Sequence, residues 1–306
     1  MLRRKISTTY TVTKQTRRGT LSMANGMILP PNKWELHDPF LMCAEDWFRH
    51  PGGFDLHPHR GFETVTIVFD GLLRHQDSKG NSSIIGPSML QWTTTGRGLL
   101  HKEVPADKET NVHLMQLWLN LPREQKLIEA SYQDLTKDII PTREIKSSNK
   151  AESSKVQQTG EEEELAAKIR VISGTSGNIK GPAKNIVPVK ALDISILEPN
   201  FTLEEPIPAN YNMFIYILEG NGSFGDDNTK LQSGNVLISS PLRNDDCNEE
   251  SVLKITNEGV NVLRVILFAG KPIREPVVQH GPFVGNEWDD IIRAQKDFYL
   301  GKFAEL

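Results

Sequence analysis

The chain has 306 residues, with 35 Lys and Arg against 39 Asp and Glu and a formal net charge of −4. This length allows two ordinary domains, each with a core of its own. The near balance of charge gives no electrostatic reason to expect direct nucleic-acid binding. No apolar run approaches the roughly 20 residues of a membrane-spanning helix.

The N-terminal segment is basic, since no acidic residue precedes Glu35. Its composition is similar to that of an organelle transit peptide, but the β-rich run 8–13 favours a first pair of strands. Cys43 and Cys247 are the two cysteines. They allow one disulfide, but we expect a reduced, cytoplasmic protein, with a nuclear location open for a eukaryotic source.

Short β-rich runs separated by Gly, Asp and Asn follow along the first half of the chain. The expected strands are residues 62–69, 72–76, 83–85, 89–93 and 112–121. This spacing predicts an antiparallel sandwich or barrel, and the absence of alternating long helices disfavours a doubly wound fold.

The chain changes character after residue 140. Residues 147–155 and the run Glu161–Glu164 are polar and charged without apolar periodicity, which predicts a solvated linker or surface insertion over residues 141–166. An acidic interaction segment is the alternative. Strand signals return at residues 169–172.

The second half repeats the pattern of the first half. The run 213–218 and Gly220 mirror the run 64–69 and Gly71, and a second glycine follows 14 residues later in one half and 15 in the other. We interpret this as an internal duplication. The predicted organisation is an N-terminal metal-binding domain, residues 1–140, and a C-terminal domain, residues 167–306, that ends in a helix over 287–303.

Two pairs of metal-ligand residues lie in the first half. His57 and His59 are two residues apart, and His101 and Glu103 show the same spacing downstream. Side chains two apart share one face of a strand, so facing strands could supply three imidazoles and a carboxylate to one divalent transition metal. Imidazole suits Fe, Cu, Ni and Zn, and a carboxylate adds preference for Mn.

Glu63 is an ambiguous member of this group. It follows His59 by four residues and shares its face if the strand is continuous, so it could bind the ion or orient an imidazole. Either Glu63 or Glu103 completes a four-ligand set. His75, Asp77 and His113 could lie nearby, but residues of these types more often occupy a strand surface or a core.

The second half has no equivalent of this group. Pro206 and Pro208 stand where the repeat places the two histidines, and Asn212 stands in place of Glu63. We therefore expect one metal ion per chain and a C-terminal domain without a metal site.

Several motifs together are similar to those of the pirin family of the cupin superfamily, over nearly the full chain and most strongly over residues 38–135. The matching segments are Asp38-Pro39-Phe40, His57-Pro58-His59-Arg60-Gly61-Phe62-Glu63-Thr64-Val65-Thr66, Gly86-Pro87, Gln91-Trp92, Gly96-Arg97-Gly98-Leu99-Leu100-His101-Lys102-Glu103, Tyr132-Gln133-Asp134-Leu135 and Gly281-Pro282-Phe283-Val284. The charged insertion at 147–164 is a departure from the family, and the run 23–34 fits no pattern that we can place.

The resemblance implies an all-β bicupin, two tandem jelly-roll-type barrels with a short C-terminal helix. It also implies one non-haem iron, Fe(II), bound by His57, His59, His101 and Glu103, with Zn, Mn, Cu, Ni or Co as alternatives. Glu63 then supports an imidazole rather than binding the ion.

The resemblance further implies a quercetin 2,3-dioxygenase-type activity on a flavonol-like enol and O2. Glu103 is then the candidate catalytic base. The alternative is an iron- or redox-sensing adaptor that regulates transcription through protein partners. A sugar-isomerase-like activity is disfavoured, because we find no sugar- or phosphate-binding pattern.

Overall fold

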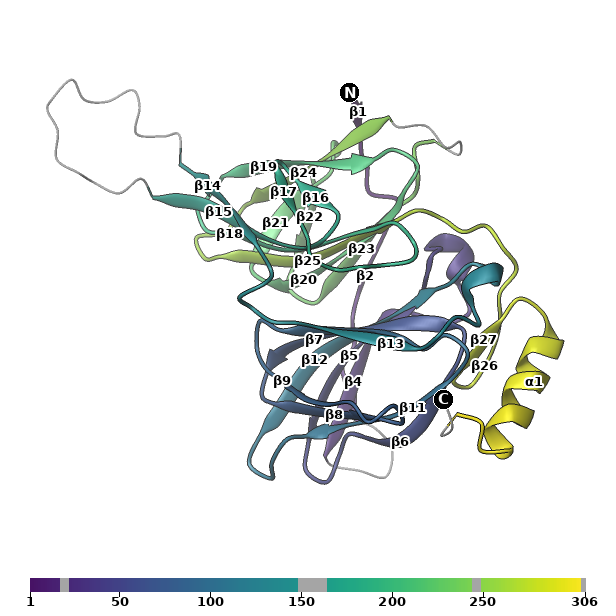
Figure 1. Cartoon of the computed structure of the whole chain (residues 1–306). Coiled ribbons are helices and arrows are strands. Elements are labelled where there is room, and N and C mark those ends of the chain that lie inside the picture. The colour runs from purple at the N-terminus through teal and green to yellow at the C-terminus, as the bar shows by residue number, and fades with distance from the viewer. Residues whose placement is uncertain (17–21, 148–163, 244–248, 304–306) are drawn as a thin grey trace, which may run out of the picture. The chain divides into compact units, whose positions relative to one another are not determined.

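The computed structural model describes residues 1–16, 22–147, 164–243 and 249–303. It divides into two compact units (Figure 1). The first unit contains Val12–Ile139, Ala183–Pro188 and Gly270–Leu306. The second unit contains Met1–Thr11, Ile140–Pro182 and Val189–Ala269.

The first unit has two main antiparallel sheets and a short hairpin. The seven-stranded sheet has the order β13 (Ser131–Leu135), β10 (Leu90–Thr94), β7 (Phe62–Asp70), β12 (Asn111–Asn120), β5 (Phe40–Arg49), β4 (Met23–Leu29) and β3 (Gln15–Thr16). The four-stranded sheet has the order β6 (Phe54–His59), β11 (Leu99–Pro105), β8 (Leu73–Asp77) and β9 (Ser82–Ile85). The hairpin pairs β26 (Val278–His280) with β27 (Phe283–Gly285), and two 3₁₀ turns span Trp34–Leu36 and Arg123–Gln125.

Apolar side chains from both main sheets form a core of this unit. They are Met23, Phe48, Val68, Leu73, Ile85, Val112 and Leu114. Because alternate residues of a strand face alternate sides, the other side of each strand is free to carry polar groups.

The second unit has the same general construction. Its seven-stranded sheet has the order β14 (Thr142–Lys146), β15 (Leu165–Ser173), β18 (Val189–Ile196), β25 (Leu263–Gly270), β20 (Asn212–Glu219), β23 (Asn235–Ser239) and β2 (Thr8–Thr11). A second sheet has the order β1 (Leu2–Arg3), β24 (Glu250–Asn257), β21 (Asn221–Phe224) and β22 (Thr229–Gln232), with β19 (Thr202–Pro208) on β24. A small hairpin pairs β16 (Thr175–Ser176) with β17 (Ile179–Lys180).

The expected all-β class, the strands of the first half and the C-terminal helix are confirmed. The repeat is also visible, because β7 and β20 each end before a glycine with positive φ, +78° at Gly71 and +79° at Gly220. Left-handed backbone of this kind favours glycine, and it allows the same tight turn in both halves.

The two ends of the chain belong to units other than those expected from sequence. Residues 1–11 lie in the second unit, where β2 pairs with β23. The last segment, with the helix, lies in the first unit. The two compact units therefore differ at both ends from the predicted division into residues 1–140 and 167–306, because strand partners distant in sequence decide which unit an end joins.

The predicted linker over 141–166 is also partly structured. β14 and the start of β15 pair within it, and the alternating exposed and half-buried side chains of β14 explain why it shows little apolar signal. Residues 148–163, which include most of the charged run, lie outside the described residues, as does Cys247. Cys43 is buried.

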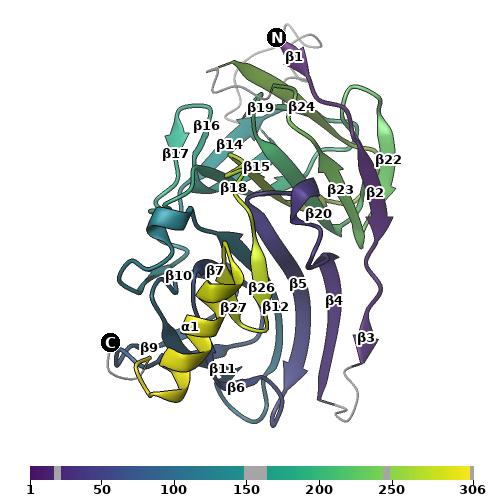
Figure 2. The ribbon, with the colours of Figure 1, turned by 90° about the vertical axis from the view of Figure 1, so that its right-hand side faces the viewer.

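Helix α1 (Trp288–Tyr299) packs beside the β26–β27 hairpin of the first unit (Figure 2). It begins with a capping box, in which the side chains of Glu287 and Asp290 accept hydrogen bonds from each other's backbone. Its buried side is Ile291 and Ala294, which join Phe283 and Phe303. Among the described residues, no helix has the length and apolar character needed to cross a bilayer.

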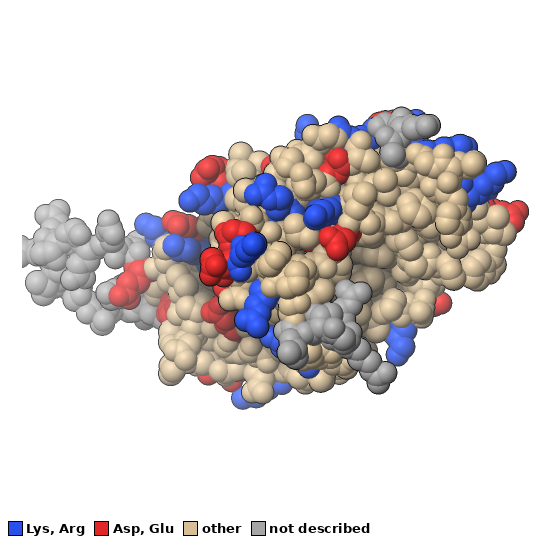
Figure 3. Space-filling view, turned by 90° about the horizontal axis from the view of Figure 1, so that it is seen from below, with Lys and Arg blue, Asp and Glu red and all other residues tan. Residues whose placement is uncertain are grey.

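Charged side chains of both signs are interspersed on the described surface in Figure 3. This mixed pattern agrees with the small net charge of the chain. It gives that face no single-signed field of the kind that attracts nucleic acid.

Candidate metal centre

Three predicted ligands meet where β6 pairs with β11. Residues 57 and 59 point to one face of β6, and His101 lies directly opposite His57 in the antiparallel register. Pro58, between the two histidines, has no N–H to donate, and β6 is an edge strand where this is tolerated. The local sequence therefore presents both rings on the face that also carries His101.

The three imidazoles converge through their Nε2 atoms. Nε2 of His57 lies 3.0 Å from that of His59 and 2.9 Å from that of His101. Two nitrogens that bind one ion at about 2.1 Å and at right angles lie about 3.0 Å apart. The spacing therefore fits three adjacent corners around a transition-metal ion.

Burial favours the neutral form of two of these imidazole rings. It lowers the pKa of His59 well below 6.5, and the neighbouring His57 lowers it further. Burial likewise lowers the pKa of His101, assisted by His59 and His57. A neutral imidazole is the form that binds a metal, so both rings are in that form at neutral pH.

Glu103, the fourth predicted ligand, lies two residues beyond His101 on β11. It is buried, and its Oε1 accepts a hydrogen bond from the Thr66 hydroxyl (3.2 Å) while Oε2 accepts one from Gln116 Nε2 (2.7 Å). Its carboxylate groups with His101 and His75, whose ligand atoms all lie within 4.8 Å of one another. Glu103 thus shares His101 with the three-histidine group.

Glu63 lies in a different place from the one expected. A turn at Arg60 and Gly61, where φ of Gly61 is +90°, separates β6 from β7, and the two strands belong to different sheets. Alternation places Glu63 on the face of β7 opposite to Thr66. There its Oε1 accepts a hydrogen bond from the Thr94 hydroxyl (2.7 Å). Among the contacts of the described residues, Glu63 therefore bonds a hydroxyl group of its own sheet and not an imidazole.

A cavity of about 440 Å³ opens beside the three histidines. Its wall includes His57 and His59, and also Gln116, which donates a hydrogen bond to Glu103. The remaining wall is largely apolar, from Met23, Ala24, Met27, Met42, Ala44, Phe54, Trp118 and Pro282. A volume of this size lies within the roughly 300–1,000 Å³ of pockets that hold small organic ligands.

Sequence reasoning missed most of this wall. Met23 and Met27 belong to β4, within the run that showed no recognisable pattern. Their place depends on pairing of β4 with β5, which local periodicity does not reveal. Residue type alone favours a strand-surface or core position for His75, although its spacing from Asp77 repeats the two-residue interval of the ligand pairs.

Polar contacts fix the turn that follows His59. Lys126 is buried and donates from Nζ to the Gly61 carbonyl (3.0 Å) and to Asn120 Oδ1 (2.5 Å). Burial lowers the pKa of Lys126 to about 7. A Cβ at Gly61 would lie 2.1 Å from the Val284 carbonyl oxygen, so only glycine fits this close approach.

Arg60 joins this turn to the C-terminal segment. Its Nε donates to the Arg97 carbonyl, its Nη1 donates to Asp297 of α1 (2.9 Å), and its guanidinium lies over the Phe303 ring. The segment that contains Pro282 and Phe283 thereby packs beside the histidine strand.

In the described part of the second unit, no group of three potential ligands is close enough to hold an ion. Pro206 and Pro208 lie on β19. His113 and His280 of the first unit also lie apart from the centre, since His113 bonds Glu45 and His280 packs near Trp288.

Family models match both halves of the chain. The model for pirin matches residues 16–119, and the model for the pirin C-terminal cupin domain matches residues 191–304. The chain belongs to the pirin family. The chain accordingly has two cupin domains, as the sequence motifs implied.

Individual relatives and solved structures match most of the chain. A pirin-like protein of Solanum lycopersicum is 39% identical over 266 residues, which are 87% of this chain and 81% of the relative. A solved structure from Geobacillus kaustophilus is 40% identical, covers 90% of this chain and 99% of its own, and has a TM-score of 0.78.

A second solved structure has an enzymatic name. The quercetin 2,3-dioxygenase of Acinetobacter baumannii is 25% identical, covers 99% of both chains and has a TM-score of 0.80. This pirin chain is thus similar over its whole length to a protein named for flavonol cleavage.

Proposed function

We propose that this pirin binds one divalent transition metal per chain through His57, His59, His101 and Glu103. The observation that carries the proposal is that the Nε2 atom of His57 lies within 3.0 Å of the Nε2 atoms of both His59 and His101, beside a cavity. Three imidazoles and one carboxylate suit Fe(II), which is the proposed ion, and also Zn, Mn, Cu, Ni and Co.

The proposed reaction is a dioxygenase cleavage of a flavonol-like enol. Two features support it: an apolar cavity adjoins the histidines, and the quercetin 2,3-dioxygenase from A. baumannii has a similar structure. When bound, the ion would supply Lewis acidity that lowers the pKa of a substrate hydroxyl and a site for O2.

The side chains of the centre have separate proposed roles. The methionines and Trp118 of the wall hold a flat aromatic ring system and exclude water. Glu103 lies behind the cavity wall, next to the wall residue Gln116, and is the proposed acceptor of the substrate hydroxyl proton. Gln116 and Thr66, which donate to Glu103, keep that carboxylate in place.

Incubation of the iron-loaded protein with quercetin tests this activity. We expect loss of the flavonol absorbance in air but not under anaerobic conditions. We expect none with His101→Ala, which removes a ligand, and a much slower loss with Glu103→Gln, which cannot accept the proton. No oxygen-dependent loss by wild-type protein with its metal verified would contradict the enzymatic proposal.

A second proposal is an iron- or redox-sensing adaptor for protein partners. It is favoured by the bond from Arg60, the neighbour of His59, to Asp297 of α1, because this helix exposes Trp288, Ile292 and Tyr299. A change at the metal could then reach an apolar surface. Pull-down with the Fe(II) and Fe(III) forms tests it, and identical partners in both states would count against it.

A further inference from the structure

His75 is a fully buried histidine without an assigned role. It lies on β8 with 0% of its surface exposed, and neither ring nitrogen has a hydrogen-bond partner among the described residues. Burying two polar atoms without partners costs free energy. A bound cation would supply the partner that the ring lacks.

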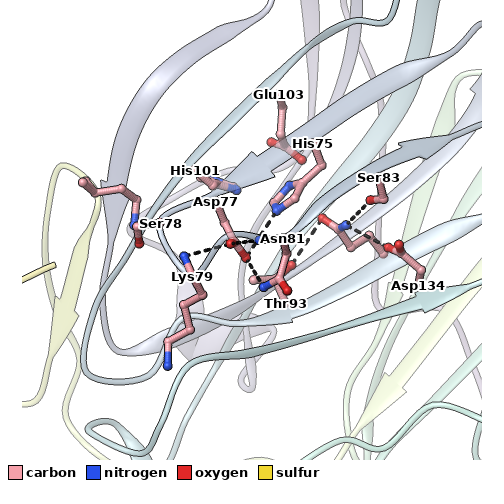
Figure 4. A network of polar contacts seen from close by, with 12 residues as sticks. His75, Asp77, Ser78, Lys79, Asn81, Ser83, Thr93, His101, Glu103 and Asp134 are labelled. Carbon is pink, nitrogen blue, oxygen red and sulfur yellow. Dashed lines mark hydrogen bonds and ion pairs between the residues drawn. The ribbon is translucent and has the colours of Figure 1, made fainter. Parts of the chain in front are cut away.

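The strand register brings His75 to the metal centre. β8 pairs with β11 so that His75 lies opposite Glu103 and Asp77 lies opposite His101. The potential ligand atoms of His75, His101 and Glu103 lie within 4.8 Å of one another, and all three residues are buried. Figure 4 shows these side chains grouped together.

Asp77 places a carboxylate near His75. Its Oδ2 lies 3.9 Å from His75 Nε2. The carboxylate is itself fixed, because Oδ1 accepts from the backbone N–H groups of Lys79 and Asn81 and Oδ2 accepts from Asn81 Nδ2 (Figure 4). At 3.9 Å this carboxylate makes no hydrogen bond to the ring, but its negative charge favours a cation beside His75.

We propose that the centre has two overlapping cation positions that share His101. The outer position is the one proposed above, with His57, His59 and His101 converging and Glu103 as fourth ligand. The inner position is formed by His75, His101 and Glu103. This inference rests on the proposed metal binding and goes beyond it by adding His75 as a metal ligand. Because His101 is common to both sets, the chain holds one ion at a time.

The two positions differ in their access to the cavity. His57 and His59 line the cavity, whereas the described cavity wall does not include His75, His101 or Glu103. An ion at the outer position is within reach of a cavity-bound molecule. An ion at the inner position is enclosed by buried side chains, so it is held but screened from the substrate.

Cobalt(II) binding to full-length protein tests the inner position. The double variant His57→Gln/His59→Gln leaves the outer set with only His101 and Glu103, which also belong to the inner set. We expect it to bind one Co(II) per chain in calorimetry, with a d–d absorption spectrum different from that of wild type. Adding His75→Gln should weaken this binding about tenfold or more. Adding His113→Gln instead is the matched control, because His113 bonds Glu45 and belongs to neither set.

Loss of Co(II) binding in the folded double variant would overturn the inner position, as would equal binding with and without His75. Circular dichroism of each variant verifies the fold. If the double variant does not fold, His57→Gln alone replaces it, since His57 is partly exposed, and adding His75→Gln must still weaken binding. If wild type itself does not bind Co(II), the proposed metal binding is rejected as well. The wild-type measurement therefore distinguishes failure of the metal proposal from failure of the inner position alone.

Discussion

At the scale of single residues, the buried polar groups of the first unit divide into two kinds. The histidines, Glu103 and His75 meet at one place on β6, β8 and β11. Glu63 instead lies on the opposite face of β7, where it accepts a hydrogen bond from Thr94 and burial raises its pKa from 4.5 to about 7. Such a carboxyl group is a source of pH-dependent stability rather than of chemistry.

The raised pKa of Glu63 predicts how stability changes with pH. The folded state binds the proton more tightly than the unfolded state, so wild-type stability falls as pH rises from about 4.5 to about 7. Glu63→Gln keeps a side-chain oxygen that accepts the Thr94 hydrogen bond. It removes the pH-dependent loss of stability, because glutamine does not ionise. We expect the variant to gain up to about 3 kcal/mol over wild type above pH 7, measured by urea unfolding at several pH values. An equal dependence on pH in both proteins would contradict this.

The residue scale also shows what sequence could reveal about the centre. The spacing of His57 and His59 is a local property of a strand, so it predicted their common face. Glu63 was misplaced because the positive φ of Gly61 ends the strand, and a continuous pattern hides that turn. His75 reaches the centre only through the register of β8 on β11, which is a long-range property.

At the scale of elements, α1 is held to the strand of the centre by a half-buried ion pair. Asp297→Ala removes the partner of Arg60. We expect a loss of about 1–2 kcal/mol in the free energy of unfolding and faster proteolysis within residues 283–303. The measurements are urea unfolding and limited trypsin digestion.

The exposed Arg293 is the matched control for this ion pair. It bonds Asp290 on the same helix, and surface pairs contribute little, so Arg293→Ala should change stability by less than about 0.5 kcal/mol. Equal effects of the two substitutions would show that the Arg60 contact does not hold the helix.

At the scale of the whole molecule, each end of the chain belongs to the unit that is built mostly from the opposite half of the sequence. Strand β2 and Arg4 lie in the second unit, where Arg4 is buried and donates to the Pro208 and Tyr211 carbonyls. The duplicated pattern predicted two domains, because it repeats within each half. It could not predict the exchanged ends, which depend on pairing across more than 200 residues.

This exchange predicts that the chain does not divide at residue 140 into two stable halves. A fragment of residues 1–140 lacks β26, β27 and α1, and a fragment of residues 141–306 lacks β1, β2 and Arg4. We expect neither to unfold cooperatively in calorimetry, unlike the full chain. Sharp unfolding transitions in both fragments, each with the unfolding enthalpy expected for a domain of its length, would show that the exchanged ends are dispensable.

The metal content of protein purified without added metal tests the central claim most directly. The shared ligand His101 belongs to both proposed sets, so its removal leaves neither complete. We predict about one transition-metal ion per chain in wild type and loss of most of it in His101→Ala, with the fold verified by circular dichroism. Stoichiometric metal retained by folded His101→Ala would show that the ion is bound elsewhere.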